Sequence, residues 1–173
     1  QPFTSALVMG NVKWFKHSWV WKKNRSSGHL NAKRKPMVNH EDVLVFASPG
    51  EMSYRPQMVP RERPVAYSAG GHGSMLYGSQ VATQTRTSTH AYPLTVQEFA
   101  SERGGHPTAK PVALFEYLIR TYSDVGDLVL DNCAGSGTTA IACMNTDRDF
   151  LLMEMDPEYH AMAEGRILEH GRS

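Results

Sequence analysis

Residues 128–139, which read LVLDNCAGSGTT, decide the fold of this chain. An apolar run ends at the carboxylate of Asp131, and a glycine-containing loop then leads into a segment of helical character. A second apolar run ends at Glu154, 23 positions later. That spacing is close to the roughly 20 residues that join two neighbouring parallel strands through a loop and a helix. We therefore expect both carboxylates at the carboxyl ends of adjacent strands, where α/β proteins bind nucleotide-type ligands.

The residues of the loop restrict the class of ligand that it can bind. Gly135 and Gly137 permit positive φ and a close approach of a ligand to the backbone. No lysine follows them, as it would in a P-loop, so a hydroxyl-rich ligand without phosphate is favoured. With Ala140 the glycines also satisfy the dinucleotide pattern Gly-x-Gly-x-x-Ala. A nicotinamide-dependent oxidoreductase therefore stays open as an alternative.

Residues 106–111, which read HPTAKP, stand just before this unit. Together with the loop and Glu154, they resemble the permuted, beta-class-like amino-group DNA methyltransferases, which methylate adenine N6 or cytosine N4. The resemblance extends from Gln1 to about Ile167, and residues 40–46 are similar to a strand that closes the family's sheet. It implies a Rossmann-like α/β fold of the S-adenosylmethionine-dependent methyltransferases, with three α/β/α layers and an inserted target-recognition region.

The resemblance also implies an organisation within one domain. Residues 1–48 would be the C-terminal part of the catalytic half, residues 49–105 the target-recognition insertion, and residues 106–173 the S-adenosylmethionine-binding half. The middle segment fits an insertion, because four prolines fall between positions 49 and 64 and a glycine-rich run follows. A plain flexible loop explains that composition equally well.

The local patterns predict individual elements on either side of this insertion. Helices are expected over residues 3–12, 111–122, 137–145 and 157–170, and strands over residues 14–21, 42–47, 127–131 and 149–153. Asp156 is the expected N-cap of the last helix, because its side chain can accept from the first backbone N–H groups.

By resemblance, the cofactor is S-adenosylmethionine, with Glu154 on its ribose hydroxyls and Met155 on its adenine. Its methionine end would contact Lys110 and Asp131. The full set of expected cofactor-binding residues is Thr108, Lys110, Asp131, Cys133, Gly135, Ser136, Gly137, Thr138, Glu154 and Met155.

Three of these residues have other readings. Glu154 can be a solvent-facing acid at a strand end, and Lys110 can pair with an acid to hold its turn. Cys133 follows Asn132 rather than the proline that precedes the nucleophile of cytosine-C5 methyltransferases, so we expect it to be a small wall of the pocket.

A one-sided charge distribution points to a polyanion. Residues 1–40 carry eight Lys or Arg and no Asp or Glu, although the net charge of the 173 residues is only +1. A basic segment of this kind typically faces nucleic acid, with a solvated surface as the alternative. The expected DNA-binding residues are Lys22, Lys23, Arg25, Lys33, Arg34 and Lys35.

The family's catalytic element is missing from the sequence. It is an Asp/Asn/Ser-Pro-Pro-aromatic tetrapeptide, and none of the 173 residues forms it. Asp156-Pro157-Glu158-Tyr159 comes near, but it follows the expected ribose ligand and opens a helix. The catalytic residues are therefore unknown, and we expect them upstream of Gln1 in a longer enzyme. The alternative is a degenerate, inactive remnant.

The sequence thus predicts a site-specific methyltransferase that acts on an exocyclic amine of a flipped base in double-stranded DNA, with adenine N6 favoured. No metal is expected. Two cysteines in a chain of this length form no disulfide framework, and no apolar run reaches the roughly 18 residues of a membrane span, so a soluble cytoplasmic protein is expected. Homodimers occur in the family, and a homodimer remains a candidate state.

Overall fold

The computed structural model describes residues 2–50, 52–68, 85–101 and 109–172. In chain order its elements are α1 (Pro2–Gly10), β1 (Phe15–Ser27), the 3-10 turn η1 (His29–Asn31), β2 (Val38–Phe46), β3 (Val59–Ser68), β4 (Thr85–Ala91), β5 (Val96–Glu98), α2 (Val112–Tyr122), β6 (Leu128–Asp131), α3 (Thr138–Met144), β7 (Asp149–Leu152) and α4 (Pro157–His170). They form two compact units, one of residues 56–93 and one of the remaining chain. The four expected helices and four expected strands are all present, with ends shifted by a few residues.

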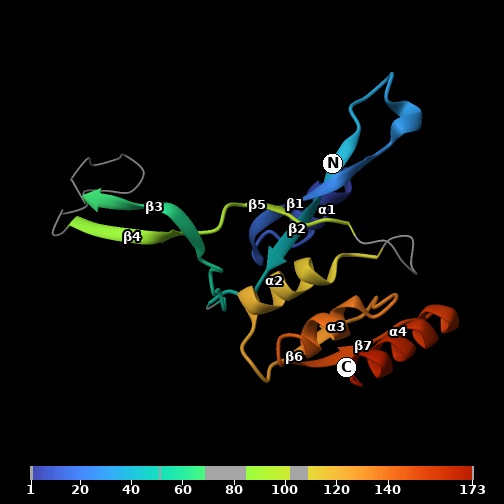
Figure 1. The fold of residues 1–173 in the computed structure, drawn as a ribbon. Coiled ribbons are helices and arrows are strands. Elements are labelled where there is room, and N and C mark those ends of the chain that lie inside the picture. The colour runs from blue at the N-terminus through green and yellow to red at the C-terminus, as the bar shows by residue number, and fades with distance from the viewer. Residues whose placement is uncertain (1, 51, 69–84, 102–108, 173) are drawn as a thin grey trace. The chain divides into compact units, whose positions relative to one another are not determined.

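The larger unit contains a three-stranded sheet in the order β2-β1-β5 (Figure 1). β1 is antiparallel to β2 and parallel to β5. Aromatic residues of β1 anchor this sheet, because Trp19 and Trp21 are only 5% and 3% exposed. β1 continues to Ser27, beyond the expected end at Trp21, since its polar end pairs with β2 as far as Val38 rather than burying apolar side chains.

The second sheet of this unit consists of β6 and β7. The two strands are parallel, with Leu128 opposite Asp149 and Asp131 opposite Leu152, as the spacing of the carboxylates predicts. One face packs on helices through Val129 and Phe150, which contact the core residues Ile119, Ala142 and Cys143. Burial raises the pKa of the Cys143 thiol, an effect that Arg148 partly offsets. We conclude that this core keeps Cys143 a neutral packing residue.

The opposite face of the β6–β7 pair is bare in the described part of the chain. Leu128, Leu130 and Leu151 are 65%, 59% and 49% exposed. Successive side chains of a strand alternate between faces, so these leucines share one surface. Contiguous apolar surface of this kind marks a place that other polypeptide normally covers.

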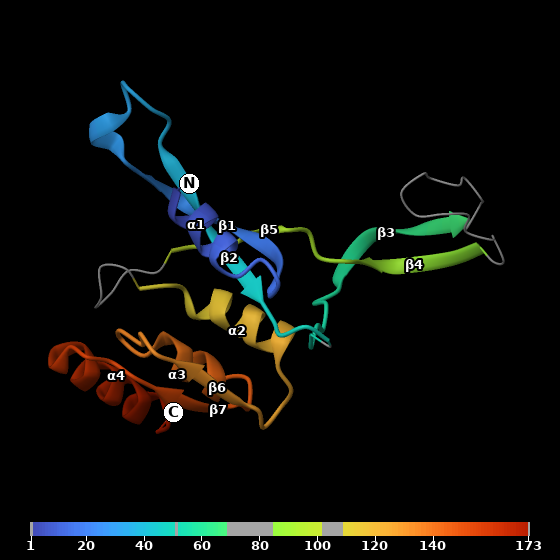
Figure 2. The same ribbon diagram turned by 180° about the vertical axis from the view of Figure 1, so that it is seen from behind.

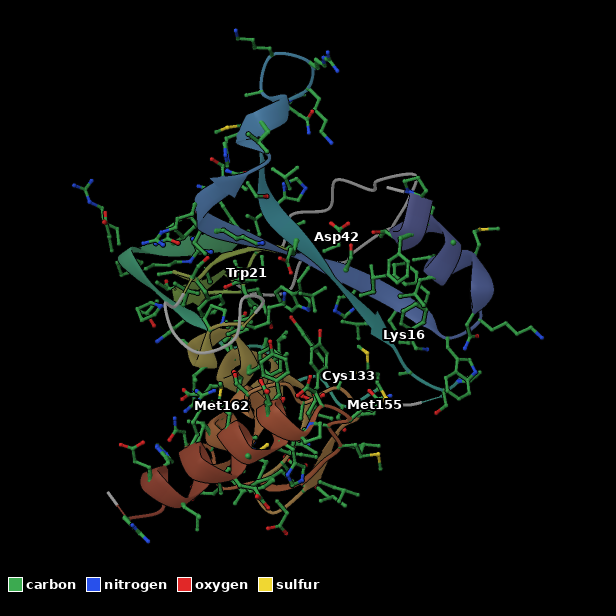
Figure 3. All side chains as sticks on the ribbon, turned by 90° about the vertical axis from the view of Figure 1, so that its right-hand side faces the viewer. Lys16, Trp21, Asp42, Cys133, Met155 and Met162 are labelled. Carbon is green, nitrogen blue, oxygen red and sulfur yellow. The ribbon has the colours of Figure 1, made fainter. Side chains whose placement is uncertain are left out.

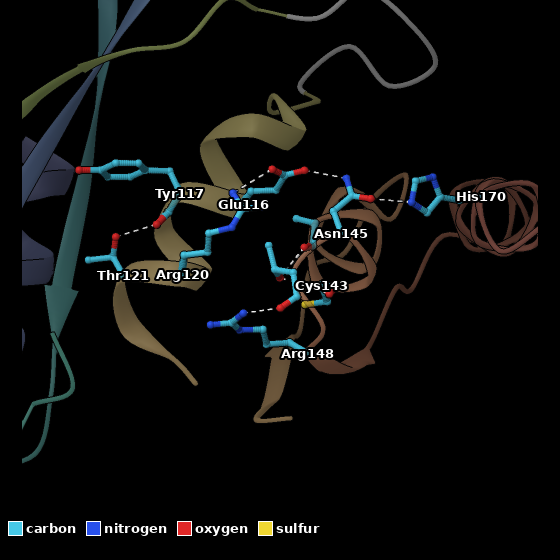
Figure 4. Close-up of polar contacts among 10 residues, drawn as sticks. Glu116, Tyr117, Arg120, Thr121, Cys143, Asn145, Arg148 and His170 are labelled. Atoms are coloured by element: carbon cyan, nitrogen blue, oxygen red, sulfur yellow. Dashed lines mark hydrogen bonds and ion pairs between the residues drawn. The ribbon is translucent and has the colours of Figure 1, made fainter. Parts of the chain in front are cut away.

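Helix α2 lies between the three-stranded sheet and α3 in both views (Figure 1 and Figure 2). Its ring of Tyr117 packs edge-on against Trp19, with centroids 5.8 Å apart. Toward α3, Glu116 accepts from the amide of Asn145 at 2.6 Å, and Asn145 in turn contacts His170 of α4 at 2.7 Å (Figure 4). A polar chain therefore ties α2, α3 and α4 together at the surface.

Among the described residues, no ladder of hydrogen bonds joins β6–β7 to β2–β1–β5, so β2 and β6 each keep an unpaired edge. A cavity of about 460 Å³ lies against β2 and is lined by residues 43–47 together with Leu118 and Tyr122 of α2. A second cavity, of about 490 Å³, lies against β6 and is lined by Leu118, Tyr122, Leu128 and Val129 among others. The same α2 side chains thus lie beside both open edges.

The smaller unit is an antiparallel ribbon of β3 and β4. Val59 pairs with Ala91 at one end and Ser68 with Thr85 at the other, with an irregularity between Pro60 and Val65. Prolines cannot donate to a ladder, which explains why pairing lapses at that place. The unit lies within the range 49–105 assigned to the insertion, whereas β5, also within that range, pairs with β1.

Candidate functional site

The glycine loop, defined here as residues 132–137, connects β6 to α3. Gly135 and Gly137 have φ values of 53° and 76°, which confirms the expected positive φ. A Cβ at Gly137 would lie 2.9 Å from the Cβ of Ala163 in α4. The close approach at this glycine therefore comes from a helix of the same chain, and a side chain would push the loop off α4.

Asp131 ends β6 and organises the start of the loop. Its Oδ1 accepts from the backbone N–H of Cys133 at 3.0 Å, and its Oδ2 accepts from the hydroxyl of Thr139 in a short bond. Thr139 is not among the site residues that the sequence predicts, although it lies within the stretch that predicted the loop. Asp131 is thus a loop-holding residue that also faces a cavity.

Glu154 joins the glycine loop to the start of α4. Its Oε2 accepts from the backbone N–H of Gly135 at 2.7 Å, and its Oε1 accepts from that of Asp156 at 2.9 Å. The side chain of Asp156 caps α4 by accepting from the N–H groups of Glu158 and Tyr159, as expected. The near-miss tetrapeptide that begins at Asp156 therefore serves as a helix start.

A cavity of about 430 Å³ opens beside the carboxyl end of β6. Six of the expected cofactor residues line it: Lys110, Asp131, Cys133, Gly135, Ser136 and Thr138. Apolar side chains of α2, including Phe115 and Leu118, form its other wall. An apolar wall with a few convergent polar groups is typical of a small-molecule site.

Glu154 and Met155 lie outside this cavity lining. Glu154 lines a neighbouring cavity of about 210 Å³ with Ala134, His160 and Ala163, among others. Met155 is 96% exposed, and Figure 3 shows it with Cys133 at the same end of the β6–β7 pair. Glu154 and Met155, the residues expected to contact the ribose and the adenine, therefore lie beside the cavity of about 430 Å³. The loop residue Ala134 lines both cavities.

Ser136 and Thr138 are 5% and 7% exposed at the start of α3. Arg166 of α4 donates from Nη1 to the carbonyl oxygen of Ser136 at 2.7 Å and to its Oγ at 3.1 Å. No local pattern in the sequence marks Arg166, because its partner is 30 residues away. It brings a positive charge to the loop backbone.

Lys110 pairs with an acid, as one of the two interpretations of this residue predicts. Its Nζ lies 3.0 Å from Oε2 of Glu41 on β2, whose Oε1 accepts from Lys23 of β1. Burial alone would raise the pKa of the Glu41 carboxyl, but the hydrogen bonds and charges of Lys23 and Lys110 outweigh it and hold that pKa below its ordinary value. Thr108 lies outside the described residues.

The expected DNA-binding residues fall on one hairpin. We call residues 22–35, which run from the end of β1 through η1, the basic ribbon. Lys22 pairs with Glu98 at 2.6 Å and Lys23 pairs with Glu41, while Arg25, Lys33, Arg34 and Lys35 are exposed. Two of the six residues thus pair with acids of neighbouring strands, although Lys22 is itself exposed, and the other four present their charge at the surface.

In the described ranges, no cluster of three or more His, Cys, Asp or Glu could hold a metal ion. No described helix is both long enough and apolar enough to cross a membrane.

The chain matches the N6/N4 family model described as DNA methylase over residues 4–165. It is 27% identical over 167 residues to Type II methyltransferase M.XycI of Xanthomonas campestris pv. cyanopsidis, covering 96% of this chain and 49% of that protein. It is 39% identical over 72 residues to DNA adenine methyltransferase YhdJ of Escherichia coli, covering 42% of this chain and 24% of that protein. Its fold is similar to that of M1.HpyAVI in complex with SAM, with a TM-score of 0.61, 24% identity, and coverage of 95% and 68%. The chain thus spans about half, or less, of these two curated relatives.

Proposed function

The chain belongs to the N6/N4 DNA methylase family, and from that membership we propose that it is part of an enzyme that methylates an exocyclic amine of a base in double-stranded DNA. The bound cofactor would be S-adenosylmethionine, whose sulfonium supplies the methyl group. The base would be flipped out of the duplex to reach it. The alternative of a nicotinamide-dependent oxidoreductase has no support in the family match.

The observation that carries the proposal is the cavity at the carboxyl end of β6. Its volume of about 430 Å³ is within the range of small-molecule sites, and Asp131, Ser136 and Lys110 give it charged and hydroxyl groups. A carboxylate and an ammonium group in one lining suit the amino and carboxyl groups of a methionine moiety. This donor set fits S-adenosylmethionine better than a phosphate-bearing cofactor.

Glu154 is proposed as the ribose ligand. Its Oε2 accepts from the backbone N–H of Gly135 and its Oε1 from that of Asp156, and a carboxylate oxygen can accept more than one hydrogen bond. The backbone bonds hold the carboxylate in place before any ligand arrives. We propose that Met155, exposed beside it, packs on the adenine ring.

The catalytic tetrapeptide is proposed to lie in polypeptide outside these 173 residues. Support comes from the unpaired edges of β2 and β6, the cavities beside them and the bare leucines of β6 and β7. An added strand would satisfy an open edge and cover apolar surface at the same time. A catalytic segment seated there would stand next to the cofactor cavity.

We propose adenine N6 as the target atom, supported by the similarity to the relative named as a DNA adenine methyltransferase. Exposed charges of the basic ribbon would contact backbone phosphates. The compact unit of residues 56–93, which carries Arg61, Arg63 and His90, would take part in recognition of the target sequence.

Calorimetric titration with S-adenosylmethionine tests the cofactor site. We expect binding by the wild type and a loss of about ten-fold or more in Glu154→Ala, because the ribose contact and the hold on Gly135 are both removed. Glu164→Ala is the matched control, since Glu164 lines the same small cavity and lies 3.7 Å from Nδ1 of His160 on α4 rather than on the backbone of the glycine loop. Absence of binding by a folded wild type would contradict the proposal.

A separate experiment tests catalysis. A longer form of the protein that includes residues preceding Gln1 should transfer methyl groups to duplex DNA. One observation favours a second candidate function, an inactive DNA- and cofactor-binding remnant, because the tetrapeptide is missing from the 173 residues. Binding of both ligands without turnover by the longer form would establish the remnant instead.

A further inference from the structure

Glu41 connects two lysines from distant parts of the chain. One carboxylate oxygen accepts from Lys23 on the neighbouring strand, and the other lies 3.0 Å from Nζ of Lys110, which lines the cavity at the carboxyl end of β6. The family signature in this sequence singled out Lys110 but gave no role to Glu41. The structure therefore adds an acid to the immediate surroundings of the cavity.

The position of Glu41 is fixed by the sheet. Glu41 is the cross-strand partner of Trp21 in the β1–β2 register. Trp21, labelled in Figure 3, is 3% exposed and donates from Nε1 to the carbonyl oxygen of Phe99 at 2.9 Å. Lys110, in contrast, is on an irregular segment just before α2. The acid is thus the anchored member of the pair, and the lysine is the member whose position depends on it.

Charge explains why both lysines need this acid. Nζ of Lys23 lies 5.0 Å and Nζ of Lys110 5.9 Å from the centre of the Trp21 ring. Two ammonium groups around one indole repel each other, and the carboxylate between them turns that repulsion into two attractions. Without it, Lys110 would be expected to move away from Lys23 and into solvent.

We propose that Glu41 is a positioning residue for the cofactor, which holds Lys110 Nζ at the edge of the cavity where the carboxylate of S-adenosylmethionine binds. The role rests on the proposed function. An ammonium group has three donors, so the bond to Glu41 leaves others for a ligand. Glu41 itself would not touch the cofactor.

The test compares two ligands. S-adenosylmethionine carries the amino acid end, whereas 5′-methylthioadenosine has the adenine and ribose without it. We expect Glu41→Gln to bind S-adenosylmethionine about five-fold more weakly, the scale of a partly exposed ion pair, and to bind 5′-methylthioadenosine as the wild type does. A purely structural role for Glu41 would weaken both ligands alike.

Two further variants complete the design. Glu98→Gln is the matched control, because it also removes a carboxylate paired with a β1 lysine, at 2.6 Å, but has no link to Lys110. In a Lys110→Met background, Glu41→Gln should have no additional effect on binding of S-adenosylmethionine, since Glu41 acts through that lysine. Circular dichroism and melting curves confirm that each variant is folded.

The outcomes separate the two proposals. Failure of the folded wild type to bind S-adenosylmethionine would overturn the proposed cofactor and this role with it. If the wild type binds, equal losses for both ligands, no loss, or an undiminished loss in the Lys110→Met background would each overturn the role of Glu41 alone.

Discussion

The glycine loop and the basic ribbon are both proposed to contact a ligand, yet they are built in opposite ways. Three side chains hold the loop: Asp131 of β6 accepts from Cys133, Glu154 between β7 and α4 accepts from Gly135, and Arg166 of α4 donates to Ser136. The four outer charges of the ribbon are exposed instead. The glycine loop has a fixed geometry before its ligand binds, whereas the basic ribbon presents charges whose positions are not fixed by such contacts.

The difference follows from what each ligand requires. A small molecule is recognised by a few groups at defined positions, so any freedom of the loop would cost affinity. A phosphate backbone attracts cations over several ångströms and tolerates many arrangements. Changes in the loop should therefore affect folding and cofactor binding together, whereas changes in the four outer charges of the ribbon should affect DNA binding alone.

Gly137→Ala should have the largest effect on stability. The new Cβ would lie 2.9 Å from that of Ala163, at a residue with φ of 76°. We expect a loss of about 3 kcal/mol in the free energy of unfolding, from strain and steric overlap together, measured by denaturant titration.

Gly135→Ala is the matched control for that variant. Its φ of 53° is also positive, but nothing lies within 4 Å of the added Cβ, so we expect a loss of only about 1 kcal/mol. Ala163→Gly should restore part of the stability of Gly137→Ala. Equal losses in the two glycine variants would show that contact with α4 is unimportant.

Neutralising the tip of the basic ribbon should give the next largest effect. The combined variant Lys33→Gln, Arg34→Gln and Lys35→Gln should bind duplex DNA about ten-fold more weakly at low salt, and the slope of log affinity against log salt should fall by about 2 to 3. Its melting temperature should stay that of the wild type. Lys22→Gln should change the slope less, because Lys22 already pairs with Glu98. A large drop in melting temperature would contradict the separation of the two regions.

Arg166→Gln should cost about 1 kcal/mol, since it removes the hydrogen bonds from Nη1 to the backbone and hydroxyl of Ser136. Ser136→Ala removes only the hydroxyl acceptor and should cost less. We expect Arg166→Gln also to weaken cofactor binding, which calorimetry would detect. Normal binding with reduced stability would show that the loop keeps its shape without Arg166.

The cofactor half was predictable from the sequence because its signals are local. The cap at Asp156, the parallel β6–β7 pair and the positive φ of Gly135 each depend on residues a short distance apart. Contacts across the chain were not predictable. Arg166 with Ser136 and Glu41 with Lys110 join residues whose proximity only the tertiary fold creates.

The smallest expected effect concerns His17, at the end of the three-stranded sheet away from the ribbon. Its Nε2 lies 2.7 Å from the hydroxyl of Tyr122, which accepts from Trp19 at 2.5 Å, and burial lowers the pKa of this histidine from its ordinary value of 6.5. The unfolded chain therefore binds a proton at a higher pH than the folded chain, and the stabilising contribution present above pH 6.5 is lost as the pH falls through the lowered pKa. Denaturant titrations between pH 7.5 and about 5 should show that the free energy of unfolding falls less steeply with pH in His17→Gln than in the wild type. The control is His29→Gln, which changes an exposed histidine in the basic ribbon and should follow the wild type. If the free energy of unfolding falls equally in all three proteins, other groups cause the pH dependence and His17 does not contribute to it.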